Sequence, residues 1–228
     1  MTPRPAPRHP TPRRRAGARI AAMLALADAA FAMPAGATTK SEEALRGVEV
    51  AIFAGGCFWC VESDFDHVPG VVETVSGYTG GHVLNPTYQQ VSHEDTGHRE
   101  AVMITFDPKV VSFDKLLDVY WRSVDPTDAG GQFCDRGHSY MTAIYATTPE
   151  QLATAQASKA ALDARDWPAA PIVTEIVAAG PFWPAEDYHQ DYYQKNPLRY
   201  RVYRWNCDRD ARIDEVWGDE AHRGIVKE

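Results

Sequence analysis

The stretch Gly55-Gly56-Cys57-Phe58-Trp59-Cys60 stands between a run typical of a β-strand, residues 48–53, and a short run typical of a helix, residues 61–65. Two consecutive glycines allow a tight turn from strand to helix at little steric cost. We therefore expect Cys57 in the first turn of a helix, where unpaired backbone N–H groups and the helix dipole stabilise an anion.

A thiol at that place tends to have a lowered pKa, and the thiolate is the nucleophilic form of cysteine. Phe58 and Trp59 can wall an apolar pocket around the sulfur. The alternative is that Cys57 is a buried structural cysteine, which is the commoner fate of a free cysteine. The double glycine and the two neighbouring aromatic side chains favour a reactive thiol.

Composition limits the classes of protein to consider. The chain has 228 residues, of which 44% are hydrophobic, enough for one well-buried domain and a tail. Its net charge is −8, although residues 1–37 contain six arginines and one aspartate, so the acidic excess lies in the rest of the chain. An acidic body argues against a nucleic-acid-binding surface and against docking on anionic lipid.

Residues 1–37 are typical of an export signal. Arginines precede the apolar stretch 20–27, and Ala35-Gly36-Ala37 offers small residues at a plausible cleavage spacing. A disordered extension, or a start codon chosen too far upstream, is the alternative. We expect a periplasmic or secreted protein if this segment is a signal peptide, and a cytoplasmic one otherwise. No other stretch approaches the roughly 20 apolar residues of a membrane span, so we expect no membrane insertion after processing.

The rest of the chain alternates between strand and helix patterns. We expect a linker at 38–46, one domain at 47–217 and a polar tail at 218–228, with strands at 48–53, 71–78, 100–106, 141–146 and 172–178. We expect helices at 113–124, 149–165 and 185–195, a long loop at 82–98, and a largely loop-like segment after residue 198. This order predicts an α/β fold, a two-layer sandwich with a mixed sheet covered by helices.

Glu100 begins the expected strand 100–106. The two-residue period of a strand places Glu100 on the same face as Val102, Ile104 and Phe106. If that face is buried, the carboxyl is desolvated, its pKa rises, and it can act as a general acid near neutral pH. If the opposite face is buried, Glu100 is an ordinary solvated residue, and the strand pattern alone does not decide.

Four cysteines follow the expected signal: Cys57, Cys60, Cys134 and Cys207. They are too sparse for a fold held together by disulfides. A second CxxC pair is missing, so we expect no metal site.

Six blocks in order resemble one known family. They are Gly56-Cys57-Phe58-Trp59, Ser76-Gly77-Tyr78 with Gly80-Gly81, Asn85-Pro86-Thr87-Tyr88, Gly97-His98-Arg99-Glu100, Asp135-Arg136-Gly137 through Tyr140, and the block from Pro184 to Tyr192. Together they resemble peptide methionine sulfoxide reductase of the A type over residues 48–217.

The resemblance implies an α/β sandwich that reduces the S epimer of methionine sulfoxide, free or in oxidised proteins, without metal or flavin. It implies a cysteine sulfenic acid, then an intramolecular disulfide that an external dithiol such as thioredoxin resets. By the same resemblance, Cys57 is the nucleophile and Glu100 is the acid. The substrate-binding residues that it implies are Phe58, Trp59, Tyr88, Asp135 and Tyr140.

The resolving cysteine departs from the family pattern. Many members carry two cysteines in a glycine-rich C-terminal tail, whereas only Cys207 lies in the tail here. We expect Cys207 to resolve the sulfenic acid, with Cys60 as the alternative because residues i and i+3 are neighbours on a helix; Cys134 is then a structural cysteine. The expected partners are a thioredoxin, or a thioredoxin-like protein if the chain is exported, and the protein itself is expected to be a monomer.

Two other functions compete with this interpretation. A general dithiol–disulfide oxidoreductase would use Cys57 and Cys60 as its redox pair, but it leaves Glu100 and the tyrosines without a task. A non-enzymatic binding module would use the aromatic side chains around Trp59 to hold an apolar peptide side chain. Three histidines are expected to serve only as hydrogen-bonding residues: His98, His138 and His189.

Overall fold

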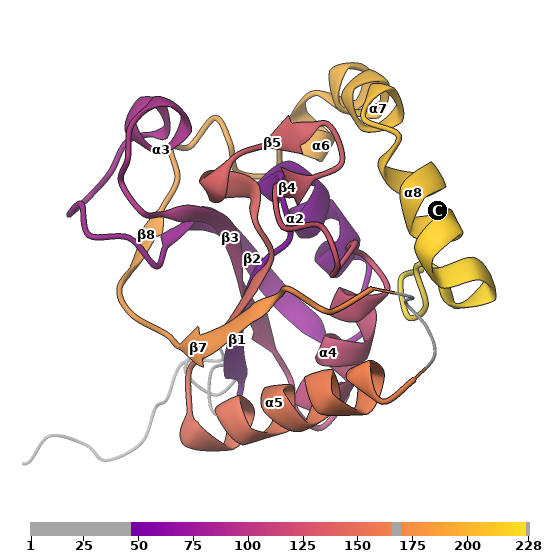
Figure 1. Cartoon of the computed structure of the whole chain (residues 1–228). Helices are drawn as coiled ribbons and strands as arrows, with labels where there is room; N and C mark the ends of the chain where they lie inside the picture. Colours follow the sequence, from indigo (N-terminus) through magenta and orange to yellow (C-terminus); the bar gives the residue numbers. More distant parts are fainter. Residues whose placement is uncertain (1–46, 166–169, 227–228) are drawn as a thin grey trace, which may run out of the picture. The chain divides into compact units, whose positions relative to one another are not determined.

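The computed structural model describes residues 47–165 and 170–226, and the predicted export signal lies outside these described residues. Their main sheet has six strands in the order β7-β6-β1-β3-β2-β8 (Figure 1). The strands are β1 (Glu49–Ala54), β2 (Val71–Thr79), β3 (Arg99–Phe106), β6 (Ala143–Ala146), β7 (Glu175–Ala178) and β8 (Phe182–Pro184). Only the β6–β7 pair is parallel, and the other neighbours are antiparallel, so the prediction of a mixed sheet is confirmed.

The main core lies between one face of the sheet and the helices α2 (Phe58–Asp66), α4 (Phe113–Trp121) and α5 (Pro149–Asp163). Alternate residues of a strand point to opposite faces, so Phe53 and Val102 enter this core while Ile52 belongs to a smaller cluster on the other face. The predicted two-layer α/β sandwich is therefore confirmed.

The helices begin where their capping residues predict. The hydroxyl of Ser112 accepts the backbone N–H of Lys115 and caps α4, whose apolar stripe is buried. Pro149 is the first residue of α5, where its missing N–H costs nothing. Helix α4 ends at Trp121, three residues earlier than expected, because Arg122 takes up the C-cap.

Two predictions for irregular segments are wrong. The loop 82–98 contains helix α3 (Tyr88–His93), which Thr87 and Gln90 begin with a reciprocal capping box. The segment after residue 198 is not loop-like, because helices α7 (Pro197–Asn206) and α8 (Arg209–Trp217) occupy most of it. Of the helix expected at 185–195, only α6 (Tyr192–Lys195) is formed.

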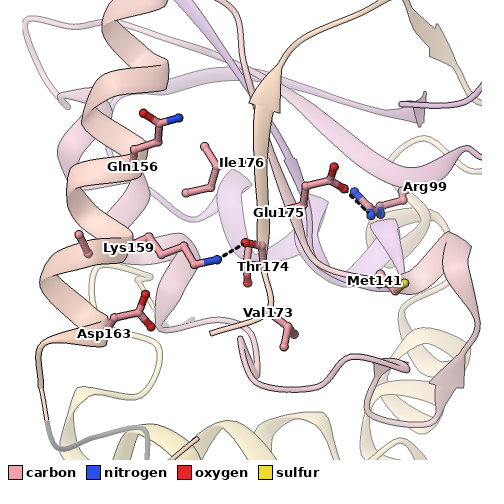
Figure 2. Close-up of a pocket in the computed structure, with 10 residues that line it drawn as sticks. Arg99, Met141, Gln156, Lys159, Asp163, Val173, Thr174, Glu175 and Ile176 are labelled. Carbon is pink, nitrogen blue, oxygen red and sulfur yellow. Dashed lines mark hydrogen bonds and ion pairs between the residues drawn. The ribbon is translucent and has the colours of Figure 1, made fainter. Parts of the chain in front are cut away.

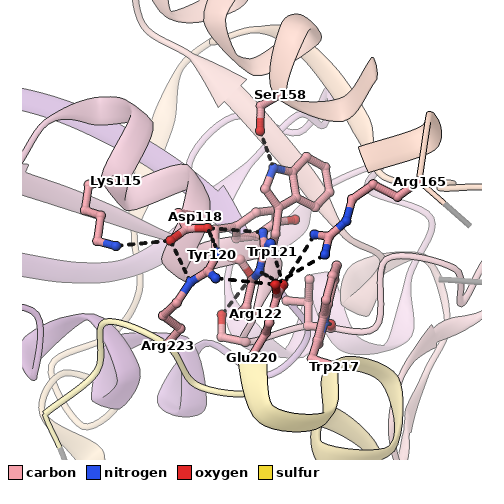
Figure 3. Close-up of polar contacts among 12 residues, drawn as sticks. Lys115, Asp118, Tyr120, Trp121, Arg122, Ser158, Arg165, Trp217, Glu220 and Arg223 are labelled. Atoms are coloured by element: carbon pink, nitrogen blue, oxygen red, sulfur yellow. Dashed lines mark hydrogen bonds and ion pairs between the residues drawn. The ribbon is translucent and has the colours of Figure 1, made fainter. Parts of the chain in front are cut away.

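A network of charges holds the C-terminal segment against α4 and α5 (Figure 3). Glu220 accepts hydrogen bonds from the buried Arg122 at 2.8 Å and from Arg165 at 3.2 Å. Asp118 pairs with Arg223 at 2.5 Å and with Arg122 at 3.2 Å. Such a network fixes the place of a segment better than an isolated surface pair does. None of the described helices has both the length and the apolarity to cross a membrane.

Candidate active site

Cys57 lies at the junction of β1 and α2 as the N-cap residue of that helix. Its carbonyl accepts the backbone N–H groups of Cys60 at 3.1 Å and of Val61 at 3.3 Å, which starts the first turn. Gly56 has φ +83°, and a Cβ there would lie 2.6 Å from the Cβ of Gln132. The second glycine of the quoted stretch is therefore required by both backbone conformation and space.

The thiols of Cys57 and Cys60 form one buried, hydrogen-bonded pair, with 6% and 2% of each residue exposed. The hydrogen bond from Cys57 lowers the pKa of Cys60 to about 7, against the effect of burial. Burial raises the pKa of Cys57 well above its ordinary value, so the predicted lowering of the Cys57 pKa is wrong. Because the two thiols titrate together, the pair loses one proton near neutral pH and holds the second.

Glu100 lies on the core side of β3 with 2% of its surface exposed. Its Oε2 accepts the backbone N–H of Phe58 at 2.9 Å, which places the carboxyl beside the first turn of α2. Burial raises the pKa of Glu100 well above its ordinary value, and the charge of Asp135 raises it further. The strand pattern left two possibilities, and the structure has the one in which Glu100 is desolvated, which disfavours its ionised form.

Tyr88 and Tyr140 reach the same region from α3 and from the 3-10 helix His138–Tyr140. Their hydroxyls interact with each other, and burial together with the charge of Glu100 raises the pKa of both phenols. Both side chains are therefore hydrogen-bond donors at physiological pH.

Aromatic rings surround the first turn of α2. The indole of Trp59 stacks on Tyr192, with ring centroids 3.7 Å apart, and its Nε1–H donates to Nδ1 of His189 at 3.0 Å. The ring of His189 also lies against Phe58 and Tyr88. Burial lowers the pKa of His189 to about 4, so this ring is neutral. The prediction that His189 serves in hydrogen bonding is confirmed, but its place in the aromatic wall was missed.

Glu186 is a second residue that sequence reasoning missed. Its carboxylate accepts the hydroxyl of Tyr78 and the backbone N–H of Tyr88, both at 2.9 Å, and so fixes the start of α3. Gln190 pairs with both the N–H and the carbonyl of Ser76 at 2.9 Å. These bonds hold the segment between Glu186 and Gln190, which contains His189, against β2. In the sequence, the only indication of a functional role for this segment was that it belongs to the sixth block.

Asp135 lies beside a disulfide. Cys134 and Asp135 belong to the hairpin of β4 (Gly131–Gln132) and β5 (Asp135–Arg136), and Cys134 is bonded to Cys207 at the C-terminal end of α7. Asp135 accepts the hydroxyl of Tyr203, and burial raises the pKa of its carboxyl. Cys207, expected to resolve Cys57, is paired here with Cys134, whereas Cys57 and Cys60 are free thiols.

The group Cys134, Asp135 and Cys207 also has the spacing of metal ligands, with the ligand atoms within 4.8 Å of one another. In the disulfide form its sulfurs carry no thiolate charge, and the thiolate is the form that binds metals. This structure therefore gives no reason to assign a metal to the group.

The predicted site residues do not line the cavity of about 620 Å³ between α5 and β7 (Figure 2). Two of its basic side chains are already paired within it, Arg99 with Glu175 at 2.6 Å and Lys159 with the carbonyl of Thr174 at 2.9 Å. We place the candidate active site at the first turn of α2 because the free thiols, the buried acid and the two tyrosines meet there.

Comparison with known proteins agrees with this geometry. The family model described as peptide methionine sulfoxide reductase matches residues 49–221. The peptide methionine sulfoxide reductase MsrA of Bacillus pumilus is 53% identical over 173 residues, covering 76% of this chain and 97% of that protein. The corresponding protein of Bacillus subtilis is 54% identical over 170 residues, covering 75% of this chain and 96% of its own.

The fold is also similar to that of solved structures. Methionine sulfoxide reductase A of Corynebacterium diphtheriae superposes with a TM-score of 0.61 at 36% identity, covering 67% of this chain and 77% of that chain. Mxr1 of Saccharomyces cerevisiae in reduced form gives the same TM-score at 28% identity, covering 66% of this chain and 87% of that chain. This chain therefore belongs to the peptide methionine sulfoxide reductase family, A type, and is an enzyme that reduces methionine sulfoxide.

Proposed function

We propose that Cys57 attacks the sulfur of methionine S-sulfoxide and that Glu100 protonates the departing oxygen. The observation that carries the proposal is the hydrogen bond from the Phe58 N–H to Glu100, which places a buried acid beside the nucleophile's helix turn. A sulfoxide oxygen is a poor leaving group until it is protonated. The hydroxyls of Tyr88 and Tyr140 are proposed to hold that oxygen.

Cys60 is proposed to prepare the nucleophile. Its thiol ionises near pH 7 while hydrogen-bonded to Cys57, so it can take the Cys57 proton as Cys57 attacks. The bond between the two sulfurs and the substrate S–O bond then break as the protonated oxygen moves to the Cys57 sulfur, so that thiol and sulfoxide become sulfenic acid and methionine. Phe58 and Trp59 are proposed to enclose the substrate methyl group, with His189 closing the wall, and Asp135 to contribute a polar contact at the pocket edge.

The same pairing makes Cys60 the better candidate for the resolving step. Its thiol lies against Cys57, so it can condense with the sulfenic acid to give a Cys57–Cys60 disulfide and one water. Cys207, our expectation from the sequence, is bonded to Cys134. We therefore propose that Cys60 acts first and that Cys207 acts later in the reduction by a thioredoxin-like dithiol.

Single-turnover reduction of the separate S and R epimers of a methionine sulfoxide substrate tests these roles. The protein carries the Cys134–Cys207 disulfide and no reductant is added. We expect product from the S epimer only, no product in Cys57→Ser, and loss of two thiols in wild type. Cys60→Ser should lose one thiol and stop at the sulfenic acid. In a parallel experiment on fully reduced protein, loss of two thiols after the first turnover in Cys60→Ser but only one in Cys207→Ser would return the resolving role to Cys207. No product from either epimer would overturn the proposal.

The general dithiol oxidoreductase is not favoured, because it gives no use to the buried acid and the paired tyrosines. Reduction of insulin disulfides separates the two activities, since a sulfoxide reductase should show little of it. We also propose that residues 1–37 direct export, on the strength of the arginine run and the apolar stretch after it. The N-terminal sequence of the protein isolated from its native cells tests this.

A further inference from the structure

Helix α7 carries an apolar stripe on its outward face. Leu198, Val202 and Trp205 are 72%, 57% and 77% exposed. Their spacings of four and three residues place them on one face of the helix, while Tyr200 on the other side is buried. Three of the nine large hydrophobic side chains exposed among the described residues are thus gathered on this one helix. A gathered apolar patch, unlike scattered single residues, marks an interaction surface.

The charge around the stripe is positive although the chain is acidic. Arg199 and Arg201 are both exposed on α7, and neither forms an ion pair with another described residue. The net charge of the whole chain is −8. A partner that covers the stripe would therefore present an apolar face with neutral or acidic groups at its rim.

The stripe ends beside the disulfide. Trp205 lies two residues before Cys207, and Cys207 is bonded to Cys134 on the β4–β5 hairpin. Cys134 is exposed, whereas Cys207 is buried along with the catalytic pair, Cys57 and Cys60. Thiol–disulfide exchange needs direct access of the attacking thiolate to a sulfur. Of the four cysteines in the described residues, Cys134 is therefore the one that a second protein meets at the surface.

We propose that the outward face of α7 is the docking surface for a thioredoxin-like protein dithiol and that electrons enter this enzyme at Cys134. The proposal rests on the proposed function, since it concerns how that reaction is reset. A thiolate of the partner attacks the sulfur of Cys134, forms a mixed disulfide and releases the Cys207 thiolate. The second thiol of the partner then attacks the mixed disulfide and releases Cys134, so that the partner leaves as a disulfide and two electrons enter this chain.

Asp135 marks the route from that dithiol to the buried pair. Its carboxylate lies within 4.8 Å of both sulfurs of the Cys134–Cys207 disulfide, and its charge raises the pKa of Cys57. Tyr203, its hydrogen-bond partner, packs against the buried cluster that contains Cys57 and Cys60. The two cysteine pairs thus lie on either side of the Asp135–Tyr203 contact. Exchange of the reduced Cys134/Cys207 pair with a Cys57–Cys60 disulfide restores the two catalytic thiols and re-forms the outer disulfide.

The size of the surface suits such a partner. A standard protein interface buries about 800 Å² on each side, which corresponds to a disc with a radius of about 16 Å. Ten residues of helix extend about 15 Å. One protein can therefore cover the stripe and still reach the end of α7 where Cys134 is bonded.

The first test compares two reductants. A double variant of the stripe, Val202→Ser with Trp205→Ser, is matched by Val72→Ser with Val110→Ser, whose residues are 61% and 64% exposed elsewhere on the surface. Turnover is measured with increasing concentrations of a purified bacterial thioredoxin and, separately, with saturating dithiothreitol. We expect the stripe variant to raise the KM for thioredoxin at least about tenfold, as loss of an aromatic anchor does, with the rate in dithiothreitol unchanged. The matched variant should behave as wild type.

An unchanged KM in the stripe variant, or no reduction of wild type by thioredoxin at all, would overturn the docking proposal. An equal rise in the matched variant would do the same. If sedimentation shows that wild type is a dimer and the stripe variant a monomer, the stripe is a contact between copies and the proposal fails. Failure of the proposed function is distinct from all of these, because it would abolish turnover in dithiothreitol as well.

The second test locates the entry point. A thioredoxin in which the second active-site cysteine is replaced by serine stops at the mixed disulfide, and peptide mass spectrometry identifies its partner. We expect Cys134; a mixed disulfide at Cys57, Cys60 or Cys207 would overturn the assignment. Fully reduced wild type should release two methionines per protein without added reductant, and Cys134→Ser only one. One methionine from fully reduced wild type would refute exchange between the two pairs.

Discussion

The backbone N–H of Phe58 donates to Oε2 of Glu100 at 2.9 Å, so the residue after Cys57 holds the carboxyl that we propose as the acid. This bond favours the ionised carboxyl, yet burial outweighs it and the pKa of Glu100 lies well above its ordinary value. This bond ties helix α2 to strand β3. A shift of one relative to the other would separate Cys57 from Glu100, the proposed nucleophile and acid.

Replacement of Glu100 by glutamine should slow the single-turnover reduction of the S epimer by about 10²- to 10⁴-fold, the usual contribution of a general acid. Glutamine keeps an oxygen that can accept the Phe58 N–H, so we expect the fold and substrate binding to persist. Glu94→Gln, at an exposed position close in sequence, is the matched control and should be fully active. Wild-type rates in Glu100→Gln would remove this residue from the mechanism.

The rate should depend on pH with two limbs. It should rise through about pH 7, where the Cys57–Cys60 pair loses its first proton. At higher pH it should fall as Glu100 loses the proton it donates, because its pKa is raised well above 4.5. In Glu100→Gln the falling limb should be absent. A falling limb that persists in this variant would have to belong to another group.

Glu186→Gln should lower both stability and activity. The carboxylate accepts two hydrogen bonds, from Tyr78 and from the Tyr88 N–H, whereas an amide has one oxygen and would turn its NH₂ group toward a donor. We expect a loss of about 1–3 kcal/mol in denaturant unfolding and a higher KM for the sulfoxide, since Tyr88 is displaced. Glu215→Gln, which breaks an exposed pair with Arg212, should change neither by much.

Gly56→Ala should destabilise the fold by about 1–3 kcal/mol or more and reduce turnover, because both the positive φ and the approach of Gln132 oppose a methyl group. Gly180→Ala is the control, since nothing lies within 4 Å of the Cβ it would add. Thermal unfolding of both variants measures the difference. Equal melting temperatures would show that β1 and α2 can shift to accept the side chain.

Glu62 on α2 should make stability depend on pH. It is fully buried, and burial raises its pKa from 4.5 to about 7, against the lowering effects of the Asp191 backbone and the Ser76 side chain. The folded protein then binds a proton that the unfolded chain has released, so stability falls as the pH rises from about 4.5 to 7. Glu62→Gln should be more stable than wild type at pH 8 by about 3 kcal/mol and equal near pH 4. The same difference in unfolding free energy between Glu62→Gln and wild type at both pH values would contradict this.

The central elements of the fold could be predicted because their local signals agree with their packing. The apolar stripe of α4, the period-2 faces of β3 and the two glycines before Cys57 each have one physical interpretation. Pro197 shows where such reasoning fails. Its place just after the expected helix 185–195 is typical of a helix end, but it is the first residue of α7, and proline is compatible with both places. The residues before it are instead fastened by Glu186 and Gln190 to distant parts of the chain.

The candidate site was predictable residue by residue from the six blocks, but the pairing of its cysteines was not. Cys134 and Cys207 are 73 residues apart, and the sequence around neither cysteine indicates which residue it pairs with. The proximity of Cys60 to Cys57 did follow from helix geometry. His189 and Glu186 were missed for the same reason as the disulfide, since their partners lie more than 90 residues away in the chain.

The bond between Cys134 and Cys207 closes a loop of 73 residues, and cross-linking a loop of that size constrains the unfolded chain by about 4 kcal/mol. If electrons enter there, every catalytic cycle cuts and restores this constraint. The enzyme is then most resistant to heat and proteases while the Cys134–Cys207 bond is intact, and most easily unfolded after a partner has reduced this bond and before exchange re-forms it. The melting temperature of the enzyme in a cell then depends on how much of it has this disulfide reduced, and so on the supply of reduced thioredoxin-like protein.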